Sequence, residues 1–303
     1  MCSRPIQGAL LFLLGLVLLP VNPVQAQPQP QPLQVVATTP SLGVLAREVG
    51  GDLVEVRVLA PADRDPHYLD ARPSFMALLR RADLLLEVGA GLEEGWLPAA
   101  VSGAANPVIN TGRPGRFRAV DHLGLRPSIT VEGPNVGHVH AEGNPHFNLD
   151  PLRMSELSLA LGERLGALRP EHAGVLQARS EQVSAGLRAH AAALAARIEP
   201  GQGFVAYHED LDYLRDWLPV KGLGYLEPVP GVPPTARHLR ALVERLQGHE
   251  GRVLHAAYQP GRGGAFLHRH LGWPVHVLSL EPPVDGGLDD YLRLMESWVA
   301  PFE

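Results

Sequence analysis

Short apolar runs alternate with helical patterns along the first half of the chain. The runs are rich in aliphatic and β-branched residues and end near Gly, Pro or Asn, as strands do. They predict strands at 34–39, 54–59, 84–88 and 107–110. Helices are predicted between them, one from Ser41, which is placed to cap it, through Val49, and one over 74–81. Strands that alternate with helices are typical of a parallel sheet.

From about Pro151 the period of the apolar residues changes to that of a helix. After Pro170 no Pro or Gly-Gly interrupts the chain until Pro200. The apolar residues that recur in this stretch are Leu176, Val183, Leu187, Ala191, Leu194 and Ile198. At about 1.5 Å per residue, roughly 29 residues predict a rod of about 43 Å, which is long enough to cross a domain.

A second set of alternating elements follows the long helix. Strands are predicted at 204–207, 220–226, 253–258 and 274–280, and a helix at 236–246. We therefore predict an α/β fold of two Rossmann-like lobes joined by a long rigid backbone helix. The N-terminal lobe covers 34–165, the linking helix 166–200 and the C-terminal lobe 201–303. A single doubly wound sheet is the alternative, which the long helix disfavours, and no clear sequence repeat relates the halves.

The N-terminus has the pattern of an export signal. Arg4 precedes an apolar stretch from Ala9 to Leu19, and a small-residue cleavage site ends at Ala26, so 1–26 is predicted to be a secretory signal peptide. Residues 27–33, rich in Gln and Pro, are predicted to be a tether. The one cysteine, Cys2, leaves with the signal and cannot carry a lipid anchor after the cleavage site. We expect a periplasmic protein that is not lipid-anchored and that binds metal only through His and carboxylates.

Charge and motifs exclude some other classes of function. The 303 residues hold 26 Lys and Arg against 32 Asp and Glu, with a sequence pI near 6.2. This balance, without runs of like charge, argues against a nucleic-acid partner. No Gly-x-Gly-x-x-Gly opens a helix after the first strand, and no Gly-x-x-x-x-Gly-Lys loop is present, so nucleotide binding has little support.

Three of the 14 histidines lie just past strand ends or in the loop before a helix, where α/β proteins place their sites. His67 and His146 each follow a proline, which stiffens the backbone, and His208 directly follows a strand. Neutral imidazoles bind zinc through one nitrogen while an acceptor holds the other. The nearby candidates for that acceptor are Asp65, Asp150 and Asp210.

Around these histidines the sequence resembles the zinc and manganese solute-binding receptors of ABC importers, the cluster A-I metal receptors. The matching segments are 65–68, with Arg-Pro-Ser at 72–74 and Ala-Asp-Leu at 82–84, then 144–151, and 207–210 with Tyr213. Their order and spacing agree over nearly the whole chain after the signal. Phe147 stands where the family usually has Trp, which does not affect the ligand. The resemblance implies the same two-lobed fold.

By this resemblance His67, His146 and His208 are metal ligands, and an acidic residue after the last C-lobe strand is the fourth. Glu281 is the first choice for that position. Asp285 lies nearby in the sequence, Glu227 at the end of another C-lobe strand is the alternative, and a water could also fill the place. The ligands would come from both lobes, so that metal binding fastens the lobes together.

Three imidazoles and one carboxylate favour Zn(II), whereas manganese receptors of this type more often use two histidines and two acids. The resemblance therefore implies a periplasmic high-affinity receptor, not an enzyme, that delivers Zn(II) as its transported ligand to an inner-membrane ABC permease. We expect a monomer, with a periplasmic zinc chaperone as a further candidate partner. The alternatives are a zinc-dependent hydrolase, or an exported zinc buffer or adhesin without a transporter.

A short loop at 137–142 carries two further histidines, His138 and His140. It is interpreted either as a low-affinity capture arm or chaperone-docking point, or as a solvated loop with incidental histidines. The histidines at 172, 268 and 270 are expected at surface positions of helices. We expect lobe closure to be small and concentrated in loops, around 133–143, because the long helix resists a wide hinge.

Overall fold

The computed structural model describes residues 1, 31–128 and 140–303. The chain forms two compact units, 1–31 and 32–303. The predicted signal peptide and nearly all of the tether belong to the first unit, of which only the two end residues are described. Among the described residues, no helix combines the length and the apolar character that crossing a membrane requires.

The N-terminal lobe is built on a parallel sheet of four strands. Its strands are β1 (Leu33–Ala37), β2 (Val54–Val58), β3 (Leu84–Glu87) and β4 (Arg116–Arg118), in the order β2-β1-β3-β4. Three of them lie where the sequence predicts them. Because the strands are parallel, their carboxyl ends meet at one edge of the sheet, where loops can bring distant side chains together.

A second four-stranded parallel sheet forms the C-terminal lobe. Its strands are β5 (Gly203–Ala206), β6 (Lys221–Tyr225), β7 (Arg252–Ala256) and β8 (Val275–Leu278), in the order β6-β5-β7-β8. Both sheets thus have the order second, first, third, fourth, although no sequence repeat is visible between them. The two-lobed α/β prediction is confirmed, and the single-sheet alternative is wrong.

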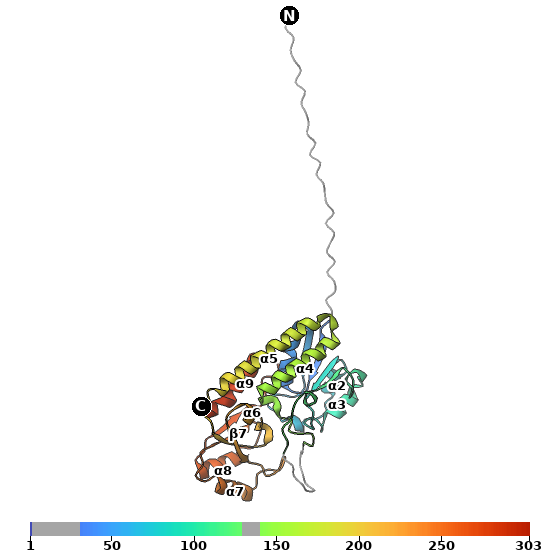
Figure 1. The fold of residues 1–303 in the computed structure, drawn as a ribbon. Coiled ribbons are helices and arrows are strands. Elements are labelled where there is room, and N and C mark those ends of the chain that lie inside the picture. Colours follow the sequence, from blue (N-terminus) through green and yellow to red (C-terminus); the bar gives the residue numbers. More distant parts are fainter. Residues whose placement is uncertain (2–30, 129–139) are drawn as a thin grey trace. The chain divides into compact units, whose positions relative to one another are not determined.

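Two long helices, α4 (Pro151–Leu168) and α5 (Ala173–Ala195), come between the two series of strands in the chain. They run side by side (Figure 1). Their axes approach closely where Gly162 faces Ser180, because a Cβ on Gly162 would lie 2.4 Å from the Ser180 hydroxyl. Helix α5 has 23 residues, about 35 Å, and is shorter than predicted. Pro170 begins a separate 3-10 turn, Pro170–His172, before α5, so the proline interrupts the helical path.

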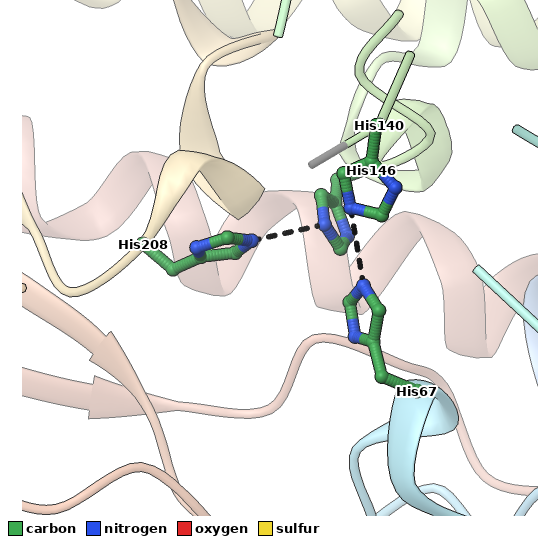
Figure 2. Close-up of side chains that lie close together, drawn as sticks. All are labelled: His67, His140, His146 and His208. Carbon is green, nitrogen blue, oxygen red and sulfur yellow. Dashed lines mark hydrogen bonds between the residues drawn. The ribbon is translucent and has the colours of Figure 1, made fainter. Parts of the chain in front are cut away.

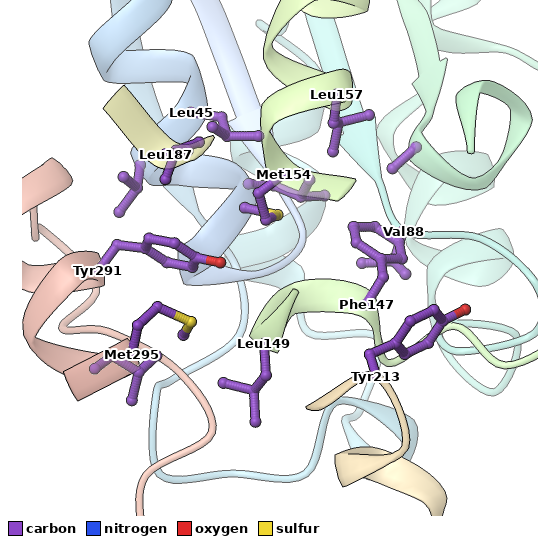
Figure 3. Close-up of a cluster of buried hydrophobic side chains, with 14 of the residues drawn as sticks. Leu45, Val88, Phe147, Leu149, Met154, Leu157, Leu187, Tyr213, Tyr291 and Met295 are labelled. Atoms are coloured by element: carbon purple, nitrogen blue, oxygen red, sulfur yellow. The ribbon is translucent and has the colours of Figure 1, made fainter. Parts of the chain in front are cut away.

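The main core lies between the two sheets and these helices. Alternate residues of each strand point into it, with Val35 and Leu86 from one sheet and Phe204 and Leu254 from the other. Helices α1 (Pro40–Gly50), α4, α5 and α9 (Leu288–Val299) close it with buried side chains (Figure 3). The drawn residues include Leu45, Met154, Leu187, Tyr291 and Met295. One continuous core therefore joins both lobes.

Smaller cores cover the opposite faces of the two sheets. Val36 and Leu85 pack with α2 (Pro73–Leu79) and α3 (Leu97–Ala104). In the other lobe, Val205 and Val253 pack with α7 (Ala236–Leu246) and α8 (Arg262–Leu271). The short helix α6 (Leu214–Trp217) contributes to the main core through its buried Leu214. Each sheet is thus covered by helices on both faces, as parallel sheets require.

Two local predictions are wrong. The apolar residues at 107–110 form a 3-10 turn, Pro107–Ile109, because proline starts it and the Asn106 side chain accepts a hydrogen bond from Val108 N at 3.1 Å. The fourth strand lies further on, in the alternating Arg-Phe-Arg of β4. Ser41 does not cap α1, since Thr39 occupies the N-cap position and Pro40 is the first helical residue.

Candidate metal centre

Four buried histidines gather between the two lobes, in loops that follow the strands and precede α4. His67, His140, His146 and His208 each offer one ring nitrogen, and these four atoms lie within 4.8 Å of one another. Figure 2 shows the four rings converging from different segments. The Nε2 atoms of His67 and His140 are 3.2 Å apart, and those of His146 and His208 are 3.3 Å apart.

His67 is held by the residues just before it. It lies in a 3-10 turn, Pro66–Tyr68, at which the carboxylate of Asp65 caps the backbone N–H of His67 at 3.0 Å. The same Asp65 oxygen is 2.7 Å from Nδ1 of His67. Trp96 donates to the Pro66 carbonyl at 2.8 Å. These bonds fix the ring with Nε2 directed at the other histidines.

His208 follows β5 directly and is oriented by a carboxylate from the neighbouring strand. Glu227, after β6, forms a hydrogen bond with His208 Nδ1. Burial lowers the pKa of His208, but the bond to Glu227 and the nearby charges of Asp210, Glu227 and Glu209 raise it to about 9. Without metal, this ring therefore carries a proton at neutral pH.

His146 is positioned by a short rigid segment that leads into α4. The Asn144 side chain accepts from His146 N at 2.9 Å and donates to the Glu209 carbonyl at 2.8 Å. Tyr213 donates to the Asn144 carbonyl at 2.6 Å, so the C-terminal lobe supports this segment. Burial, followed by the neighbouring histidines, lowers the pKa of His146 well below its usual range. This ring stays neutral at pH 7 and is ready to bind a metal.

His140 comes from the segment before His146 and is 3% exposed. Its Nδ1 is 2.9 Å from the carbonyl oxygen of Ala90, in the loop after β3. Ala90 has a positive φ of 48°, an uncommon backbone conformation for a residue other than glycine. The ring nitrogen that faces the cluster is again Nε2.

The spacing of the nitrogens suits a tetrahedral metal ion. Four nitrogens at about 2.0–2.1 Å from zinc lie about 3.3–3.4 Å from one another. Two of the nitrogen pairs already have this separation, at 3.2 and 3.3 Å, and the whole set lies within 4.8 Å, so a small contraction completes the geometry. Asp65 and Glu227 contact the outer nitrogens of His67 and His208 and orient these rings, and their carboxylates would balance the charge of a divalent cation.

A cavity of about 380 Å³ opens beside the cluster. His67, His146 and His208 line it, together with Asp65, Asp210 and Glu227 and with Tyr68, Tyr207 and Tyr258. Three carboxyl side chains thus line it against one arginine, Arg64. Such a surface attracts cations and offers a path from solvent to the cluster.

The predicted acidic ligands are not in the cluster. Glu281 accepts hydrogen bonds from the backbone N–H of Ser41 at 2.8 Å and from its hydroxyl at 2.5 Å. Burial raises the pKa of Glu281 to about 7, against the lowering effect of these bonds. Asp285 is exposed and lies 4.0 Å from Arg47. Glu227 reaches the centre only through His208, so the fourth side chain beside the three predicted histidines is His140.

One of the three predicted outer acceptors is found where the sequence places it. Asp65 binds His67, as expected. Asp150 instead caps α4, accepting from Leu152 N at 2.8 Å, and pairs with Arg153. Asp210 accepts from Gln259 Nε2 at 2.6 Å, and the partner of His208 Nδ1 is Glu227 instead.

His140 lies inside the cluster and not on the surface. The interpretation of 137–142 as a solvated loop with incidental histidines is wrong for His140, which is buried in the cluster. His138 and the rest of 129–139 lie outside the described residues. The available signal was the closeness of His140 to His146, six residues before it, since a tight turn at Gly143 can return the chain to the same place.

Two α/β lobes that share a long helix, with a histidine cluster drawn from both lobes, have the architecture of a metal-binding solute receptor. The family model described as "Zinc-uptake complex component A periplasmic" matches residues 35–303. The chain belongs to this family.

Among curated proteins, the chain is 24% identical over 239 residues to the high-affinity zinc uptake system protein ZnuA of Yersinia pestis, covering 74% of this chain and 75% of that protein. It is 27% identical over 244 residues to ZnuA of Paracoccus denitrificans, covering 73% and 74%. A crystal structure of ZnuA superposes with a TM-score of 0.73 at 20% identity, over 90% of this chain and all of that one. The Mn²⁺ complex of FpvC from Pseudomonas aeruginosa gives a TM-score of 0.76 at 20% identity, covering 89% and 98%.

Proposed function

We propose that the protein is a periplasmic receptor that binds one Zn(II) ion through His67, His140, His146 and His208 and passes it to an ABC-type permease. The convergence of these four ring nitrogens carries the proposal. Zinc is the cargo, and no bond is broken. The membership in a family of zinc-uptake components and the zinc-uptake names of two relatives support the choice of cargo.

The donor set favours zinc over manganese. Imidazole nitrogens suit Zn(II), Cu(II) and Ni(II), whereas Mn(II) prefers carboxylate and water oxygens. Four imidazoles in a closed tetrahedral arrangement, with His208 deprotonated on binding, are also a geometry that zinc accepts without penalty. Copper competes through its higher intrinsic affinity, so selection against it depends on geometry and on supply.

Both lobes contribute to the centre, which lets metal binding fasten them together. His67 follows β2, whereas His208 follows β5 in the other lobe. Outside the centre the lobes are already tied, because Arg47 of α1 donates to the carbonyls of Gly286 at 3.0 Å and Val284 at 2.8 Å. We therefore propose that closure is small and local. Part of the predicted region of change, 133–139, lies outside the described residues.

A zinc hydrolase fits this geometry less well. Catalytic zinc keeps one position open for water or substrate, whereas four histidines would fill a tetrahedral shell. A zinc buffer or adhesin would use the same centre and differ only in its partners. The family of uptake-complex components favours a transport role over both.

The remaining proposals concern export and partners. An N-terminal signal peptide would bring the chain to the periplasm without a lipid anchor, where it would act as a monomer. A periplasmic zinc chaperone is a further candidate partner. Neighbouring genes that encode a permease and an ATPase would support the receptor over the buffer.

Calorimetric titration of the chelator-stripped protein with zinc tests the proposal. We expect tight one-to-one binding that weakens by at least a hundredfold in each of His67→Ala, His140→Ala, His146→Ala and His208→Ala. His270→Ala, which changes an exposed residue of α8, is the control and should bind as the wild type does. Unchanged zinc binding in the four variants would show that these histidines are not the binding site. The zinc-hydrolase hypothesis would then be open again.

A further inference from the structure

His140 reaches the metal centre from a segment that is attached to the N-terminal lobe at two points. Its ring is held by the Ala90 carbonyl, 2.9 Å from Nδ1. Two residues further on, the carboxylate of Glu142 accepts from one guanidinium nitrogen of Arg118, at 3.0 Å for one oxygen and 2.9 Å for the other. The ring and the main chain of this ligand are therefore held by different parts of the lobe.

Arg118 is itself fixed by the sheet. It is the last residue of β4 and pairs in register with Glu87 of β3, and its Nε lies 3.7 Å from the Glu87 carboxylate. Arg116 also binds Glu87, at 2.9 and 2.6 Å. Arg118 makes another ion pair with Asp121 at 2.7 Å. The guanidinium thus offers Glu142 a partner whose position does not depend on the segment that carries His140.

The Ala90 carbonyl is fixed in a similar way. Buried Glu93 accepts hydrogen bonds from Val88 N at 2.8 Å and from Gly89 N at 3.0 Å, and Thr38 donates to it at 2.6 Å. These bonds hold the loop after β3 in the conformation that turns the Ala90 oxygen toward His140.

The hydrogen bond that holds the His140 ring is nevertheless weaker than those that hold His67 and His208. The Nδ1 atoms of His67 and His208 contact carboxylates, which bind an imidazole more strongly than a neutral carbonyl does. The Arg118–Glu142 pair is open to solvent, with 57% of the Glu142 side chain exposed. Among these three ligands, His140 is the one that can leave the metal with the least disruption.

We infer that Arg118 and Glu142 form a positioning pair that keeps His140 in the coordination shell and thereby sets how fast zinc is released. This inference rests on the proposed function, because it assigns His140 to the metal. Loss of the pair lowers the fraction of protein in which His140 is bound. A partly exposed ion pair of this kind changes such an equilibrium by about two- to fivefold, and salt screens it.

The test compares Glu142→Gln with Asp121→Asn. Both remove one carboxylate partner of Arg118 and the same unit of charge, but only Glu142 belongs to the segment of His140. We expect Glu142→Gln to speed zinc release to an excess of chelator by about two- to fivefold, and Asp121→Asn to leave it unchanged. With Co²⁺ in place of zinc, Glu142→Gln should lose part of the visible absorption of the tetrahedral ion. Raising the salt concentration should speed release from the wild type toward the rate of the variant.

A double-mutant cycle with His140→Ala separates positioning from general damage. If Glu142 acts through His140, Glu142→Gln has no further effect on the release rate once His140 is alanine. An equal effect in both backgrounds, or an equal effect of Asp121→Asn, would overturn the inference. If His140→Ala itself left the release rate and the Co²⁺ spectrum unchanged, the four-histidine centre would be wrong, which is a different failure.

Discussion

Glu227 binds the Nδ1 atom of His208, on the side of the ring opposite to the nitrogen that faces His146. The sequence suggested Glu227 as a metal ligand, but the structure places its carboxylate behind His208, away from the histidine cluster. In this position the carboxylate selects the ring orientation, raises the basicity of the imidazole and contributes negative charge near the ion.

Glu227→Gln should weaken zinc binding by about 10- to 100-fold without abolishing it, because the amide can still hold the ring but carries no charge. Calorimetry or chelator competition above about pH 9, where a proton on His208 no longer competes with zinc in either protein, measures the change. His208→Ala is the comparison, since it removes the ligand itself and should cost more. Equal losses in the two variants would mean that Glu227 is itself a ligand.

The affinity for zinc should rise with pH up to about 9. The pKa of His208 in the metal-free protein is raised to about 9, so below that pH zinc must displace a proton from the ring. Raising the pH from 7 to 9 removes this competition, and the apparent binding constant should increase about tenfold per pH unit.

Chelator competition between pH 6 and 9 follows this rise. In Glu227→Gln the partner that raises the His208 pKa loses its charge, so the curve should level off at lower pH. A wild-type affinity that is constant between pH 7 and 9 would contradict the assigned role of the His208–Glu227 pair.

Glu281 should matter for stability more than for zinc. Its carboxylate joins the loop after β8 to α1 through Ser41 and lies 3.4 Å from the Asn148 side chain. Glu281→Ala should lower the free energy of unfolding by about 2 kcal/mol, because the donors of Ser41 and Asn148 lose their acceptor. Urea denaturation of the metal-free protein measures this, with exposed Asp285→Ala as the control. A hundredfold loss of zinc affinity in Glu281→Ala would instead restore Glu281 as a ligand.

Replacing one imidazole with a carboxylate should shift the preference among metals. Mn(II) favours oxygen donors, so His140→Glu should narrow the gap between zinc and manganese by at least about tenfold relative to the wild type. The rise in melting temperature at a fixed metal concentration reports the two affinities. His140→Ala opens the same position without adding an oxygen ligand and serves as the control. An unchanged ratio in His140→Glu would argue that residue 140 does not contact the ion.

Much of the fold was accessible from the sequence, because apolar strands buried on both faces leave continuous runs such as 84–87. Helix α7 was predicted with its observed bounds, since its apolar positions recur at helical spacing. The edge strand β4 could not be found in this way, because Arg116 and Arg118 point away from the core and only Phe117 is buried. Pro107 and Asn106 determine a turn that a hydrophobic pattern does not reveal.

Three of the four clustered histidines could be predicted for a related reason. His67, His146 and His208 lie beside prolines or strand ends, which are visible in the sequence. His140 has no such neighbour. Its ring contacts Ala90, and Glu142 in the same segment binds Arg118, and both partners are distant in sequence. The hydrogen bonds of Glu281 could not be foreseen for the same reason. Its partner Ser41 is 240 residues away, and nothing local indicates that the serine would take up the carboxylate.

The most direct measurement is a crystal structure of the zinc-loaded protein with anomalous data collected on both sides of the zinc absorption edge. We predict a single strong anomalous peak between the lobes, about 2.0–2.1 Å from the Nε2 atoms of His67, His140, His146 and His208, with Glu281 still bound to Ser41. A peak coordinated by the Glu281 carboxylate in place of His140, or one that lies away from the histidines, would contradict the four-histidine centre.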